Sequence, residues 1–126
     1  MRYLLDTTMI ADHAHGFLPA LKLLAHLYED GADLFTCDVI TCEALSGGTD
    51  DHLEAVAHLL EPLEFVATSP TAARWAAASR LKRHRAGGKL GLGDSLIAGV
   101  AAELGATVVT RNRPDFERQG IEVLTY

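Results

Sequence analysis

Four acidic residues stand where their carboxylates could meet around a metal ion. One follows a short apolar run, one lies within a helix-like segment, one follows a glycine-rich turn, and one ends an Asn-x-x-Asp motif: Asp6, Glu43, Asp94 and Asp115. Carboxylates that are brought together repel and raise each other's pKa. A hard divalent cation removes that cost, and Mg²⁺ prefers oxygen ligands. The set therefore predicts metal-dependent chemistry on a phosphate.

Each acid also has a simpler structural interpretation. Asp6 at a strand end and Asp94 after a pair of glycines could each cap a helix. Glu43 could lie on a solvated helix face, although its apolar neighbours favour partial burial. Asp115 lies three residues after Asn112, so the two side chains could share one side of a helical turn, or Asp115 could cap a turn. No single acid decides between these interpretations, and the functional hypothesis depends on the set.

The elements that would position these acids alternate along the chain. Strands are expected over residues 2–5, 34–36, 64–67, 107–109 and 121–124. Helices are expected over 7–14, from 19 to about 30, from 38 to about 46, from 51 to about 60, over 70–85 and from 94 to about 104. This order predicts a parallel sheet with helices on both faces, in which sites form beyond the carboxyl ends of strands. Asp6 and the segment 110–115 are therefore expected at one edge of the sheet.

Local signals predict where several of these helices begin. Thr7 or Thr8 can cap the first helix, and Asp38 can cap the helix that carries Glu43. Asp51 followed by Glu54 three residues later resembles a capping box.

Length and composition fit an ordinary globular domain. The chain has 126 residues, which we expect to form one domain over 1–126, with 48% apolar and 22% charged residues. No apolar run approaches the roughly 18 residues of a membrane span, and the N-terminal stretch is too short for a signal peptide, so a cytoplasmic protein is expected. Cys37 and Cys42 match no zinc spacing and are expected to be buried or half-buried free thiols.

The chain resembles the PIN-domain family, and in particular its small VapC-type toxin ribonucleases, over essentially its whole length. The resemblance rests on Leu4-Leu-Asp6-Thr-Thr, on Glu43, and on the segments 91–98 and 103–117. It implies a three-layer α/β/α fold around a mainly parallel sheet of about four or five strands. It further implies cleavage of RNA with Mg²⁺ or Mn²⁺, inhibition by a cognate VapB-type antitoxin, and a homodimer.

The resemblance also implies a metal site built from Asp6, Glu43, Asp94 and a fourth group. Many family members carry Asp where this chain has Asn112, and here the acid comes three residues later, at Asp115. Either residue, or both, could supply the fourth ligand, and the charged Asp115 is favoured. Hydroxyl groups that would support the site come from Thr8 and Thr110.

Basic residues gather in the second half of the chain although the net charge is −6. Nine of the eleven Lys and Arg residues lie between Arg74 and Arg118, which predicts a local positive patch. Its candidate RNA contacts are Arg80, Lys82, Arg83, Arg85, Arg111 and Arg113. Such contacts position a nucleic acid without choosing its sequence. A solvated helix end is the alternative, and Trp75 is expected to pack against a neighbouring helix.

Two other functions remain open at this point. The carboxylates could be structural caps in a module that binds nucleic acid or protein without cleaving it. A phosphoaspartyl phosphatase also places Asp after its first strand, but it needs a second Asp where this chain has Thr8.

Overall fold

The computed structural model describes residues 1–126 and is built on one five-stranded parallel sheet of order β3-β2-β1-β4-β5. Its strands are β1 (Arg2–Leu5), β2 (Asp33–Cys37), β3 (Glu64–Val66), β4 (Thr107–Val109) and β5 (Val123–Leu124). Every neighbouring pair is parallel, and Leu4 in β1 pairs with Phe35 on one side and Val108 on the other. The predicted parallel sheet is confirmed.

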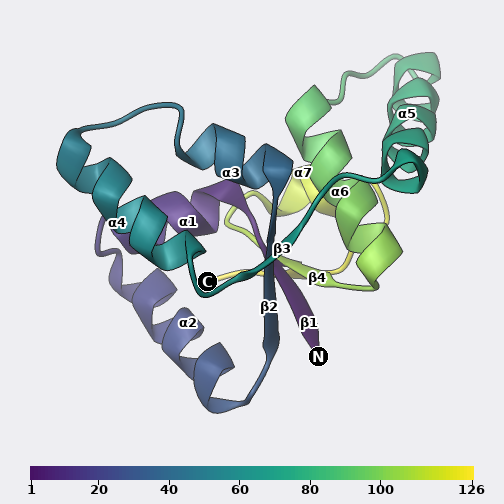
Figure 1. Ribbon diagram of the computed structural model, residues 1–126. Coiled ribbons are helices and arrows are strands. Elements are labelled where there is room, and N and C mark those ends of the chain that lie inside the picture. Colours follow the sequence, from purple (N-terminus) through teal and green to yellow (C-terminus); the bar gives the residue numbers. More distant parts are fainter.

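Seven helices cover the sheet on both faces (Figure 1). The first group is α1 (Thr7–Ala14), α2 (Leu18–Glu29), α3 (Asp38–Ala44) and α4 (Asp50–Leu60). The second group, on the other side of the sheet, is α5 (Pro70–Arg85), α6 (Leu92–Leu104) and α7 (Arg113–Glu117). The three-layer α/β/α arrangement is therefore also confirmed. Helix α3 contacts both α1 and α6, so it links the two helical groups above the sheet.

The central strands are apolar because helices bury both of their faces. Leu4 and Leu5 of β1, and Val108 and Val109 of β4, have no exposed surface. A continuous apolar run of this kind is typical of an inner strand in a parallel sheet. The chain runs from β1 outward through β2 to β3, then crosses to β4 and β5 on the other side of β1. The order thus reverses between β1 and β4, where open α/β sheets form their sites.

Helices α5 and α6 pack backbone to backbone through small residues. A Cβ atom added at Gly99 of α6 would lie 2.4 Å from the carbonyl oxygen of Ala72 in α5, so only glycine fits there. The buried residues of α5 are Ala72 and Ala76. This close contact leaves the long basic side chains of α5 on the outside of the molecule.

Four predicted helix starts need correction. Helix α6 begins at Leu92 with Gly91 as its N-cap, so Asp94 lies in the first turn and does not cap the helix. The N-cap of α1 is Asp6, and neither Thr7 nor Thr8 caps the helix. The N-cap of α3 is Cys37, so Asp38 occupies the first helical turn rather than the cap.

The capping box predicted at Asp51 and Glu54 is also wrong. Helix α4 begins after Thr49, whose side chain accepts a hydrogen bond from the backbone N–H of His52. Thr49 precedes two aspartates, so three candidate caps stand in a row, and the structure uses the first.

Two expectations concern the cysteines and the membrane. Cys37 and Cys42 are both free thiols, as predicted; Cys37 is buried, but Cys42 is exposed, so the burial expected for it is not found. None of the helices combines the length and the apolar character that crossing a lipid bilayer requires.

Candidate active site

Asp6 lies at the carboxyl ends of the two central strands. Its backbone N–H continues the sheet by donating to the carbonyl of Val109 at 3.0 Å. Its side chain is 3% exposed and accepts hydrogen bonds from the hydroxyls of Thr110, at 2.7 Å, and of Thr8, at 3.3 Å. The topology therefore brings one buried carboxylate and two hydroxyl donors together from segments more than 100 residues apart.

The two hydroxyls are oriented by the backbone that follows β4. The N–H of Asn112 donates to the Thr110 hydroxyl at 2.9 Å, and the N–H of Arg111 donates to the Thr8 hydroxyl at 3.2 Å. Each hydroxyl oxygen thus already accepts one bond, which directs its own proton toward a neighbouring acceptor. The two hydroxyls also lie 3.1 Å from each other. Asp6 is consequently held in one position by a network rather than by a single contact.

Burial raises the pKa of Asp6 above its ordinary value. Hydrogen bonds from the side chains of Thr110 and Thr8 and from the backbone of Thr7 lower the pKa in part, and the negative charge of Glu43 raises it further. The net direction is upward, so the folded protein resists a negative charge at this position in the absence of a cation.

Glu43 reaches the same edge from α3. Its side chain is exposed, so the partial burial expected from its apolar neighbours is not found. The Thr7 hydroxyl donates to its Oε1 at 2.7 Å. A Cβ atom added at Gly93 would lie 2.5 Å from its Oε2, so the glycine leaves the space that this carboxylate occupies. Residues of α1 and α6 thus position Glu43 jointly.

Asp94 lies half-buried in the first turn of α6 and is the acid most affected by the others. Its pKa is raised to about 6, first by burial and then by the charges of Asp6, Asp115 and Glu43, in that order. A helix N-terminus favours a carboxylate, and here this effect is outweighed. Asp94 therefore lies close enough to Asp6, Asp115 and Glu43 for each of the three charges to act on it.

Asp115 and Asn112 act on each other directly. The Asn112 side-chain amide donates to Oδ2 of Asp115, and Asn112 is the N-cap residue of α7. Asn112 holds the carboxylate with its amide nitrogen, and this bond leaves its amide oxygen free; that Asp115 is the fourth ligand stays a prediction.

The donor set has the chemistry that Mg²⁺ and Mn²⁺ prefer, since it consists of carboxylates, an amide and hydroxyls. In this conformation, no three His, Cys, Asp or Glu side chains converge closely enough to hold one ion. Uncompensated carboxylates repel one another, so a splayed arrangement is expected without a cation. That these residues bind metal stays a prediction, and closing the site around an ion requires side-chain movement.

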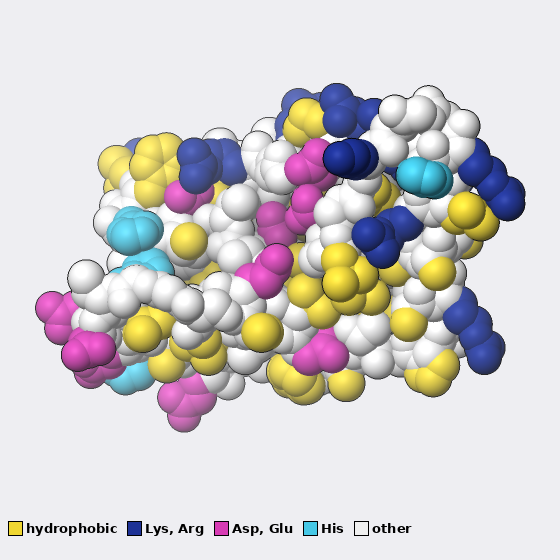
Figure 2. Space-filling view, turned by 90° about the horizontal axis from the view of Figure 1, so that it is seen from above, with side chains coloured by type: hydrophobic (Ala, Val, Ile, Leu, Met, Phe, Trp, Pro, Cys, Tyr) yellow, Lys and Arg dark blue, Asp and Glu magenta, His cyan; other side chains and the backbone are white.

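Acidic side chains gather near the middle of this edge, and basic ones lie mostly toward the side of α5 (Figure 2). Two of the basic residues predicted to contact RNA are occupied by ion pairs. Arg111 binds Asp12 at 2.7 Å, and Arg113 binds Glu117 at 2.7 Å. Neither guanidinium is therefore as available for an RNA phosphate as the sequence suggested. The other four predicted contacts are Arg80, Lys82, Arg83 and Arg85, and none of them forms an ion pair.

Two residues of the site escaped the sequence interpretation. Thr7 was considered as a cap, but its hydroxyl holds Glu43. Gly93 is one of the two glycines before Asp94, and it leaves the space that the same carboxylate occupies. The neighbouring hydroxyl and the glycine-rich turn were visible in the sequence, whereas their common partner in α3 was not.

Comparison with known proteins gives consistent relationships. The PIN domain family model matches residues 3–121. Ribonuclease VapC19 of Mycobacterium tuberculosis is 29% identical over 111 residues, covering 86% of this chain and 87% of that protein. Among solved structures, VapBC2 of Rickettsia felis, bound to a DNA fragment from its promoter, gives a TM-score of 0.86 at 20% identity, over 100% of this chain and 99% of that chain.

A toxin–antitoxin complex from Klebsiella pneumoniae gives a TM-score of 0.72 at 22% identity, over 90% of this chain and 89% of that chain. These structural similarities show a shared fold. The family match covers both central strands and all four acids of the site. The chain therefore belongs to the PIN domain family.

Proposed function

We propose that this protein is a metal-dependent endoribonuclease and the toxin of a toxin–antitoxin pair. The observation that carries the proposal is the coupling of Asp94 to Asp6, Glu43 and Asp115 at the carboxyl edge of the sheet. Four carboxylates that repel one another destabilise the fold, and a bound cation would compensate their charges. The family match and the ribonuclease VapC19 add support for RNA as the substrate.

Asp6 and Asp94 are the proposed direct ligands of Mg²⁺ or Mn²⁺. When bound, such an ion neutralises the phosphodiester and helps a water molecule to act as the nucleophile. Asp6 contributes a fixed oxygen, because the hydroxyls of Thr8 and Thr110 hold its carboxylate. Glu43 and Asp115 are further ligands or hold the attacking water. Glu43 is exposed and therefore suited to contact substrate-bound water.

The activity is tested with Asp6→Asn and structured RNA in the presence of Mn²⁺. Asparagine keeps the size and one acceptor oxygen for the threonine hydroxyls but loses the charge. We expect cleavage to disappear, as it should for the parent in EDTA, while the circular dichroism spectrum stays the same. Asp30→Asn is the matched control, because Asp30 is an exposed acid at the end of α2. A variant at position 6 that cuts at the parental rate would remove Asp6 from the site.

The alternative is a PIN-fold module that binds nucleic acid or protein without cleaving it. The absence of a ready-made three-ligand group in this conformation is the observation in its favour. Isothermal titration with Mn²⁺ separates the two functions. If no binding is measured and Asp94→Ala has no effect on RNA turnover, the binding module is the better description.

The proposed antitoxin has a candidate docking surface on the first helical group. A groove of about 580 Å³ lies between α1, α2 and α4 and is mostly apolar, with Leu21, Leu24 and Leu59 in its lining. Tyr28 beside it is 48% exposed. We propose that an apolar segment of the antitoxin fills this groove, in line with the toxin–antitoxin complex that shares the fold.

The groove is tested with Ala25→Arg, which places a charge in its exposed lining. His26→Arg, at an exposed position of the same helix outside the groove, is the control. We expect Ala25→Arg alone to lose co-purification with the proposed antitoxin. A cytoplasmic homodimer is also proposed, and sedimentation of the purified protein tests the dimer.

A further inference from the structure

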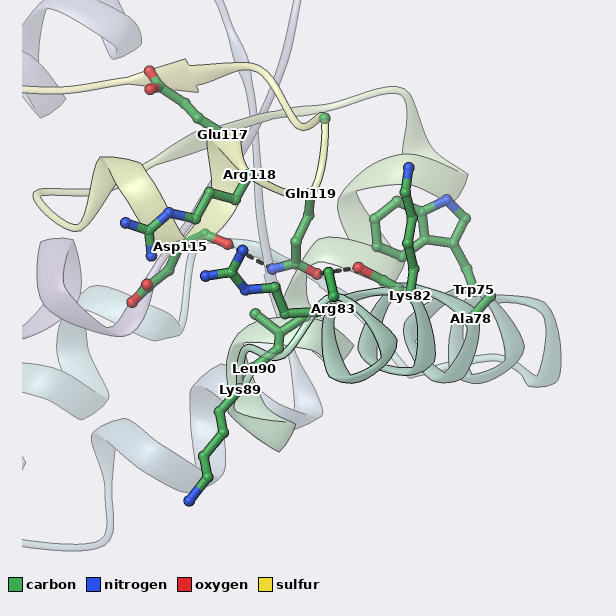
Figure 3. A pocket seen from close by; sticks show the side chains of 13 residues that line it. Trp75, Ala78, Lys82, Arg83, Lys89, Leu90, Asp115, Glu117, Arg118 and Gln119 are labelled. Carbon is green, nitrogen blue, oxygen red and sulfur yellow. Dashed lines mark hydrogen bonds between the residues drawn. The ribbon is translucent and has the colours of Figure 1, made fainter.

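A second cavity, of about 570 Å³, opens between α5 and α7 next to the acidic edge (Figure 3). Asp115 lines one end of it, so the cavity adjoins the proposed active site. Trp75 lies toward the other end. Four cationic side chains line the space between the two helices: Lys82, Arg83, Lys89 and Arg118.

The positive charge of this cavity is compensated only in part, since Asp115 is the one acid of the lining without an ion pair. None of its four cations forms an ion pair, since the two ion pairs of the structure use Arg111 and Arg113. Of the two acids in the lining, Glu117 is already paired with Arg113. Lys82, Lys89 and Arg118 are exposed, so solvent screens their mutual repulsion, but an anionic ligand in the cavity would be attracted to all four cations.

The cavity has fixed walls. Gln119 accepts a hydrogen bond from the Ser79 hydroxyl at 3.0 Å and donates to the backbone carbonyl of Asp115 at 2.7 Å, so it ties α5 to α7 (Figure 3). Arg83 is half-buried, and its side chain lies against Gly88 so closely that a Cβ atom there would meet its Nε at 2.3 Å. The arginine is therefore partly immobilised before any ligand arrives.

We propose that this cavity binds one nucleotide of the RNA strand beside the bond that is cut. A guanidinium matches the geometry of a phosphate, and Arg83 and Arg118 provide two of them. Trp75 is half-buried and packs against the apolar core, in keeping with the packing role expected from sequence. The part that lines the cavity provides an aromatic surface for the base, and stacking of this kind accepts any base. The volume lies in the range of small-ligand sites, roughly 300–1,000 Å³. The inference rests on the proposed ribonuclease function and specifies where its substrate is held.

This site changes the set of RNA contacts predicted from sequence. It keeps Lys82 and Arg83 and adds Lys89 and Arg118, whereas Arg80 and Arg85 do not line the cavity. It also gives RNA a place to bind that needs no metal ion. An acidic peptide would share the attraction to the cations, but it would leave the aromatic end of the cavity unused.

The test uses the full chain in EDTA, so that RNA binds without being cut. Trp75 is the only tryptophan of the protein, and its fluorescence therefore reports on this cavity alone. We expect hexaadenylate RNA to quench it. Arg83→Ala and Arg118→Ala should each weaken the affinity by about five- to tenfold, the size of one charged contact. Each should also lower the slope of log affinity against log salt by about 0.7.

Arg74→Ala is the matched control, since it removes one exposed charge from α5 outside the cavity. It should bind RNA within twofold of the parent. Trp75→Leu keeps an apolar side chain but removes the ring, and labelled hexaadenylate should bind it several-fold more weakly by fluorescence anisotropy.

The outcomes separate this inference from the proposed function. If RNA quenches the Trp75 fluorescence of the parent, but the parent cuts no RNA with Mn²⁺, the nuclease proposal fails and the nucleotide-binding site is supported. If the parent cuts RNA but Arg83→Ala and Arg118→Ala bind and cut as Arg74→Ala does, the cavity is not an RNA site. Tighter binding of hexaglutamate than of hexaadenylate would also overturn the inference and assign the cavity to an acidic protein segment.

Discussion

Neutralising Asp94 should stabilise the metal-free protein at neutral pH. The pKa of Asp94 is raised from 3.8 to about 6, which corresponds to roughly 3 kcal/mol at about 1.4 kcal/mol for each pH unit. Because the side chain is only half-buried, solvent screening reduces this to about 1–2 kcal/mol. The folded state binds the proton more tightly than the unfolded chain does. The stability that protonated Asp94 contributes to the folded state is therefore present in full below pH 3.8 and is lost as the pH rises through about 6.

Asp94→Asn imitates the protonated acid, because asparagine is uncharged and can still donate a hydrogen bond to Asp115. In EDTA at pH 7.5 the variant should unfold about 3–8 °C above the parent, as expected for 1–2 kcal/mol in a chain of this size. The difference should shrink as the pH is lowered toward 4, where the parent is itself protonated. Thermal unfolding followed by circular dichroism from pH 4 to 8 measures this directly.

Adding Mn²⁺ should reverse the order of stability. The ion binds the ionised parent and raises its unfolding temperature, whereas the variant has lost one ligand and gains less. Asp30→Asn, an exposed acid distant from the site, should follow the parent throughout. If Asp94→Asn is no more stable than the parent in EDTA at pH 7.5, Asp94 is not under electrostatic strain and the reasoning is refuted.

Two further substitutions test how the neighbouring groups are positioned. Gly93→Ala should keep the unfolding temperature within a few degrees but lower RNA cleavage at least about tenfold, because the new methyl group displaces the flexible end of Glu43 rather than the helix. Gly91→Ala is its control and should keep most of the cleavage, since a Cβ atom there meets nothing closer than 3.8 Å. Thr110→Val removes a buried hydrogen bond to the Asp6 carboxylate and should lower the free energy of unfolding by about 1–3 kcal/mol, measured by urea titration; an unchanged urea midpoint would show that the hydroxyl does not stabilise Asp6.

The sheet could be predicted from sequence because its inner strands have only one plausible environment. Segments such as 107–109 are short, consist of β-branched residues and follow an expected helix, which fits an inner parallel strand. Helix starts were harder to predict. Asp6, Thr7 and Thr8 are all good caps, and the local pattern does not rank them. The structure settles the choice by giving both threonine hydroxyls to carboxylates, one of them in the distant α3.

Only the part of the candidate site that follows directly from the strand order could be predicted from sequence. Asp6 and the segment 110–115 follow neighbouring parallel strands, so their shared edge follows from topology. The positions of Glu43 and Asp94 depend on how α3 and α6 lie across that edge, which no local pattern specifies. The basic cavity depends on a similar long-range contact, since Gln119 joins α7 to α5 across 40 residues.

The wide spacing of the acids along the chain has a consequence for biosynthesis. Asp6 is translated long before residues 109 and 110, which supply the strand that pairs with it and the hydroxyl that holds it. A nascent or prematurely terminated polypeptide cannot build this centre, whatever partial structure it forms. The centre can therefore form only after the segment that carries Thr110 has been synthesised.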